Sequence, residues 1–292
     1  MRRLELLVIA ACLLSTACAT QSGATGSAAA DEKPGEDQAS AELKEHHRHH
    51  HHGGVTQFVM MSLDTLGADD AKRPQVEKIG AALRECLKPA REIEKGISAT
   101  IADGVAAGAV DASKVDGEIE KLGAASATSK DCSATALNEL HALLSPEQRA
   151  AVADKVQAHW EVWREANHEA PAGGKEAGGR LAELSEMVAL TPDQTEKISA
   201  ALASAMGSKL PKFDPAKAQA HVQAFATAFS TENFDAKTIT ENANAGLSVH
   251  GTRRLALFYE TVTPLLTPEQ RTKLADELKE HGNHQNNAVS TK

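Results

Sequence analysis

The sequence predicts an all-α protein whose folded part consists of two tandem helical units of about four helices each. A short Leu-Ser/Thr-Pro-x-Gln motif returns along the chain, and the residues that follow it carry apolar side chains at helical spacing. No comparable run shows the period of two that marks a strand. Aromatic residues make up only 3% of the chain, which suits thin layers of packed helices better than a deep core.

Residues 1–17 have the pattern of a signal peptide. Arg2 and Arg3 precede an apolar stretch that is too short to cross a bilayer, which takes about 20 apolar residues. The stretch runs into Leu14-Ser15-Thr16-Ala17-Cys18, which resembles a bacterial lipobox. We therefore expect a lipid on Cys18 that anchors a periplasmic protein to the outer membrane. The alternative is an ordinary secretory cleavage site at the same point, which would release a soluble periplasmic protein.

Residues 18–55 are predicted to form a disordered tether, because they are Ala, Gly, Ser and charged residues with no apolar period. The tether ends in a histidine tract of His46, His47, His49, His50, His51 and His52. Neutral imidazoles bind Zn, Cu and Ni, so the tract is a candidate site for a divalent transition metal. The alternative is a solvated tract without a ligand. No motif in the chain requires a cofactor.

Cys86 and Cys132 are the two cysteines that remain beyond the leader and the lipidation site. An even pair of cysteines in an oxidising compartment predicts a disulfide. Two buried free thiols are the alternative, since a disulfide requires the two Cα atoms to lie within about 7 Å of each other.

Charge and motifs exclude two classes of function. The chain has a net charge of −9, and removal of the leader, which carries Arg2, Arg3 and Glu5, brings it to −10, so nucleic-acid binding is not expected. The chain also lacks a Gly-rich phosphate loop, a Gly-x-Ser-x-Gly elbow and a His-Glu-x-x-His motif, so we do not expect an enzyme.

The repeated motif is a helix start. Ser or Thr as N-cap, Pro as first helical residue and Gln as third make a capping box, in which the side chains of the first and last bond each other's backbone amides. A worn fourth copy, without the Thr, precedes residues 75–79. The motif copies bound a unit at 56–168, a Gly-rich linker at 169–179, a second unit at 180–285 and a disordered tail at 286–292. The capping residues are Ser145, Gln148, Thr191, Gln194, Thr267 and Gln270.

These motifs resemble those of the Spy/CpxP-like periplasmic proteins, which carry paired LTxxQ motifs. The C-terminal half matches best, with Leu190-Thr191-x-x-Gln194, the turn Asn233-Phe234-Asp235 and Leu266-Thr267-Pro268-Glu269-Gln270 in the family's order. The resemblance implies an ATP-independent holdase chaperone, or an envelope-stress binding protein, that holds partly unfolded envelope proteins. The residues expected to contact such clients are Trp160, Trp163, Arg253, Arg254 and Phe258, although core packing is the alternative for the aromatic ones.

Two further expectations follow from the tandem arrangement and the tract. The chain should be a monomer in which the two units pair as two separate chains do in the family. The alternative function is a metal-sequestering or metal-sensing lipoprotein that acts through the histidine tract.

Overall fold

The structure is a computed structural model that describes residues 47, 54–63, 66, 71–167, 179–210, 214–239 and 244–290. These residues form helices and no strand, which confirms the predicted all-α class. The leader, Cys18, the linker before Gly179 and every histidine of the tract except His47 lie outside the described residues. The helices are α2 (Gly54–Leu63), α3 (Arg73–Ala107), α4 (Ala112–Leu143), α5 (Pro146–Asn167), α6 (Arg180–Val188), α7 (Pro192–Lys209), α8 (Pro215–Ser230), α9 (Ala236–Ile239), α10 (Asn244–Val262), the 3₁₀ turn η1 (Thr263–Leu265) and α11 (Pro268–Ser290).

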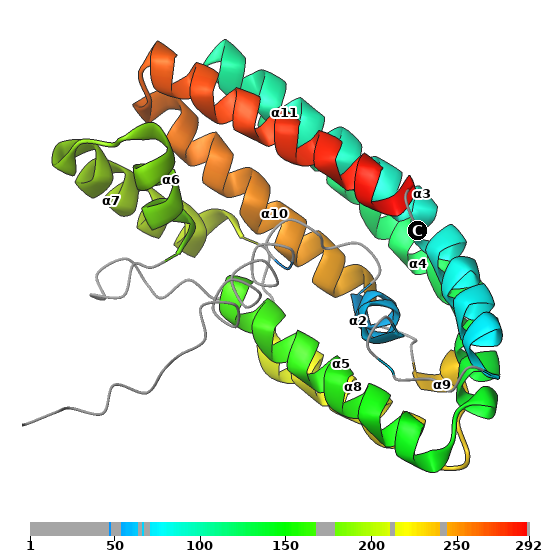
Figure 1. Cartoon of the computed structure of the whole chain (residues 1–292). Helices are drawn as coiled ribbons and strands as arrows, with labels where there is room; N and C mark the ends of the chain where they lie inside the picture. Colours follow the sequence, from blue (N-terminus) through cyan, green and yellow to red (C-terminus); the bar gives the residue numbers. More distant parts are fainter. Residues whose placement is uncertain are drawn as a thin grey trace, which may run out of the picture.

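Local signals set the ends of the long helices. Gly108 ends α3 in the left-handed region, at φ 93°, which glycine adopts without steric cost. Asp111 then begins α4 by accepting a hydrogen bond from the Lys114 amide at 3.0 Å, and Asp214 begins α8 in the same way. Pro89 lies inside α3 and cannot donate a backbone hydrogen bond, and α3 is bowed along its length (Figure 1).

The helices from the two sides of the linker interlock. The hairpin of α3 and α4 forms one long layer, and α10 and α2 lie between this layer and the pair made by α5 and α8 (Figure 1). Helix α5, from the first half, packs on α8 of the second half, while α11, from the second half, packs on α3 of the first. Helices α4 and α10 pack on each other between these two contacts. The last helix of each half therefore covers the other half.

The interior divides into two apolar clusters, and each draws on both halves. The first cluster combines the start of α3 and the end of α4 with α2, α5, α8, α9 and the start of α10; its largest buried members include Leu83, Leu137, Trp160, Phe225 and Phe229. The second combines the end of α3 and the start of α4 with α6, α7, the end of α10 and α11; it includes Ile97, Ile101, Leu122, Ile198 and Phe258.

Small and polar residues occupy α4 and α10 between the two clusters. Ser126 and Ser133 of α4 and Ser248 and Thr252 of α10 are all buried. A Cβ at Gly123 of α4 would lie 3.1 Å from a methyl group of Val249 in α10, so a small residue permits this close approach.

Among the described helices, none is both long and apolar enough to span a membrane.

A disulfide joins Cys86 of α3 to Cys132 of α4, with the two Cα atoms 5.6 Å apart. The bond ties the two arms of the long hairpin together. It lies at the level where the first cluster gives way to the polar residues of α4.

Candidate functional site

The three intact motifs form capping boxes. The hydroxyl of Thr191 accepts a hydrogen bond from the Gln194 amide at 3.2 Å, and the Gln194 side chain accepts one from the Thr191 amide at 3.1 Å. The same reciprocal pair joins Ser145 to Gln148 and Thr267 to Gln270. Each motif thus begins its helix by satisfying two backbone amides that the helix itself leaves unpaired.

The two motifs of the second half also bind each other, an arrangement we call the glutamine clasp (Gln194 and Gln270). The side-chain Nε2 of Gln194 donates to Oε1 of Gln270 at 2.8 Å, and the side-chain Nε2 of Gln270 donates back to Oε1 of Gln194 at 3.1 Å. Gln194 further donates to the Leu265 carbonyl and Gln270 to the Val188 carbonyl. The clasp therefore holds the corner between α6 and α7 against the corner between η1 and α11.

No such clasp is present among the described residues of the first half. Lys72 occupies the N-cap position of α3 and makes no side-chain cap, because the worn motif has no hydroxyl there. Its ammonium instead donates to Oε1 of Gln148 at 3.4 Å. A lysine thus contacts the motif glutamine of the first half, where the second half has a second glutamine.

An arginine that follows each closing motif reaches a turn of the other half. Arg149 donates to the Thr231 carbonyl at 2.9 Å, and His141 Nε2 lies 2.7 Å from the same oxygen. Arg271 lies over the turn that ends α3, where a Cβ at Gly108 would be 3.2 Å from its guanidinium. Sequence reasoning missed these arginines, although both follow the motif glutamine directly.

The aromatic residues expected to contact clients are core residues instead. Trp160, Trp163 and Phe258 are 2%, 3% and 1% exposed. The two tryptophan rings stack on each other in the first cluster, and the Arg180 guanidinium lies over the Phe258 ring in the second. The interlocking helices cover all three side chains, which is the core packing that their helical spacing offered as the alternative to client contact.

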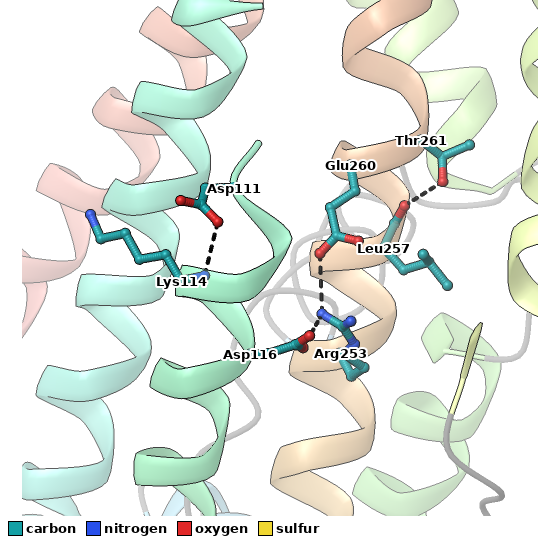
Figure 2. A network of polar contacts seen from close by, with 7 residues as sticks. All are labelled: Asp111, Lys114, Asp116, Arg253, Leu257, Glu260 and Thr261. Atoms are coloured by element: carbon teal, nitrogen blue, oxygen red, sulfur yellow. Dashed lines mark hydrogen bonds and ion pairs between the residues drawn. The ribbon is translucent and has the colours of Figure 1, made fainter. Parts of the chain in front are cut away.

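Arg253, also expected to contact clients, belongs to an ion-pair network between α4 and α10 (Figure 2). Its guanidinium lies 2.6 Å from Asp116 of α4 and 3.1 Å from Glu260, two turns further along α10. The Arg253 side chain is only 13% exposed, so its charge is paired within the fold and not presented on the surface. Arg254 beside it is half-buried.

Glu260 has an unusual environment for a carboxyl group. Its side chain is 10% exposed. Burial, reinforced by the negative charge of Asp116, raises the pKa of Glu260 above its usual 4.5, although Arg253 acts in the opposite direction.

Partly buried apolar side chains of α6, of α7 and of the turn between them pack on the second cluster. We call Leu181, Met187, Leu190 and Met206 the α6–α7 surface; all four are partly buried against that cluster. Along its 18 residues, helix α7 buries only Ile198 and Leu202. This part of the fold is therefore thinly covered, with methionine and leucine side chains that solvent can reach.

His47, the described histidine of the tract, contacts the folded part. His47 is 1% exposed, and its Nε2 lies 3.2 Å from Nδ1 of His159 in α5. Burial, and to a smaller extent Lys155, lowers the pKa of His159 below 6.5. Within the described residues, no three histidine, cysteine or carboxylate side chains gather in a group able to hold a metal ion.

No known protein family, curated protein or solved structure matches the chain. The likeness to the Spy/CpxP-like proteins consequently rests on the motifs and their order.

Proposed function

We propose that this chain is a membrane-tethered periplasmic holdase, or an envelope-stress binding protein, that holds partly unfolded envelope proteins without ATP. A lipid on Cys18 would anchor it to the outer membrane, and the tether would let the folded part reach clients. The proposal is supported by the two pairs of LTxxQ-like motifs. The interlocked halves also support a monomer, since each half already covers the apolar face of the other.

The observation that carries the proposal is the α6–α7 surface. A holdase must retain many different clients, which favours shallow apolar contact over a specific fit. Methionine suits this use because its side chain is flexible and polarizable and adapts to different partners. Met187 and Met206 lie on this surface, and the exposed Asp193, Glu196 and Lys197 keep the neighbouring face of α7 soluble.

Light scattering by reduced lactalbumin in the absence of nucleotide tests the proposal. The mature chain should suppress aggregation, and the double variant Met187→Ser/Met206→Ser should need roughly three to ten times more protein for the same effect. Lys197→Ser/Ala203→Ser, on the exposed side of α7, is the matched control and should act as the unaltered chain does. Aggregation that proceeds equally with and without the mature chain would refute the holdase proposal.

Metal binding by the histidine tract is the second candidate function, favoured by the contact between His47 and His159. Deletion of residues 46–52 separates the two candidates. A holdase should still suppress aggregation after the deletion, whereas a metal-sequestering protein should lose its metal binding.

A further inference from the structure

His47 and His159 bring two imidazole rings together on the folded body. The ring centroids lie 5.4 Å apart with the planes tilted by 57°. Phe58 of α2 packs against both rings, edge-on to His47 and stacked on His159. Because α2 packs on α5, the phenyl ring fixes where the tract meets the folded part.

The spacing of the two nitrogens suits a metal ion as well as a hydrogen bond. Two histidine nitrogens bound to one tetrahedral Zn²⁺ at about 2.0–2.1 Å are separated by about 3.3–3.4 Å. The observed separation of 3.2 Å between His47 Nε2 and His159 Nδ1 needs little adjustment to reach that value.

We infer that His47 and His159 form a two-histidine site for a divalent transition metal of the Zn, Cu or Ni class, which fastens the end of the tether to α5. His159 is the fixed partner, held by its helix, while His47 arrives from the tract. A ligand on a folded helix removes part of the ordering cost that a flexible histidine tract alone must meet.

This inference rests on the second candidate function and is independent of holdase activity. The test uses the mature chain with His46, His49, His50, His51 and His52 all replaced by Gln, so that His47 is the only histidine left in the tract. Trp160 follows His159 directly, and the chain has two tryptophans in all, both in α5. Bound Cu²⁺ should therefore quench the tryptophan fluorescence, and Zn²⁺ should reverse the quenching by competition.

Two single substitutions in this background decide the outcome. His159→Gln and His47→Gln should each weaken saturable Cu²⁺ quenching roughly tenfold or more, because each removes one of two protein ligands. His221→Gln is the matched control, a half-buried histidine of α8, and should leave the titration unchanged. Circular dichroism of each variant checks that the helices are retained.

Two results would overturn the inference, and they are distinguishable. If the chain with the intact tract binds Cu²⁺ equally well with and without His159→Gln, the tract binds metal alone and His159 is no ligand. If neither the intact chain nor the background variant binds Cu²⁺ or Zn²⁺, the second candidate function fails together with the site.

Discussion

Replacement of Gln270 by alanine should destabilise the fold more than the same change at Gln148, although both residues close a capping box. Gln270 takes part in four side-chain hydrogen bonds, with the Thr267 amide, the Val188 carbonyl and, in both directions, Gln194. At about 0.5–1.5 kcal/mol for each bond, and toward the lower end for a half-buried side chain, Gln270→Ala should cost about 2–3 kcal/mol. Gln148→Ala loses the hydrogen bond from the Ser145 amide and the longer one from the Lys72 ammonium. It should cost about 1 kcal/mol.

A double-mutant cycle isolates the glutamine clasp from the capping boxes. Gln194→Ala, Gln270→Ala and the double variant are unfolded in urea under oxidising conditions, and their free energies of unfolding are compared at unchanged m-value. The two bonds between the glutamines predict a coupling energy of about 1 kcal/mol. Additive costs, or a Gln270→Ala cost no larger than that of Gln148→Ala, would refute the reasoning that the two motif glutamines bind each other.

Three further predictions concern stability. Gly108→Ala should cost about 1–2 kcal/mol, because the left-handed φ of 93° strains alanine and its Cβ meets Arg271, whereas Gly96→Ala inside α3 has open space and should gain about 0.5–1 kcal/mol. Thermal unfolding should show that Gly108→Ala lowers stability and Gly96→Ala raises it; changes of the same sign in both variants would contradict this account. Glu260 binds its proton more tightly in the folded chain than in the unfolded one, because folding raises its pKa. The free energy of unfolding of the natural chain, compared with that of Glu260→Gln, should therefore fall as the pH rises from about 4.5 through the raised pKa. A difference between the two chains that does not change with pH would contradict the assignment. Cys86→Ala/Cys132→Ala should cost about 3–4 kcal/mol for a loop of 46 residues, and two thiols titrated in the unfolded, unreduced chain would show that the bond is absent.

The features that neighbouring residues determine could be predicted from the sequence. The capping motifs identified the starts of α5, α7 and α11, because the bonds of a capping box join residues three apart. The choice between a disulfide and two free thiols could be posed from the cysteine count, although only the folded hairpin brings the two Cα atoms within reach.

The remaining features depend on packing between distant segments. Apolar spacing shows that α5 and α10 each have a buried face, but it does not show that α5 packs on α8 across the linker. That packing is what buries Trp160 and Trp163, so their spacing alone could not decide between core packing and client contact. His159 likewise could not be paired with His47, since 112 residues separate them in the sequence.

Site-specific photocrosslinking tests the proposed client contact most directly. A photoreactive phenylalanine analogue at Met206, on the α6–α7 surface, should capture reduced lactalbumin without nucleotide. The same analogue at Lys121, an exposed position of α4, should capture little. Equal capture at the two positions, or none at Met206 in a chain that still suppresses aggregation, would contradict the claim that clients bind the α6–α7 surface.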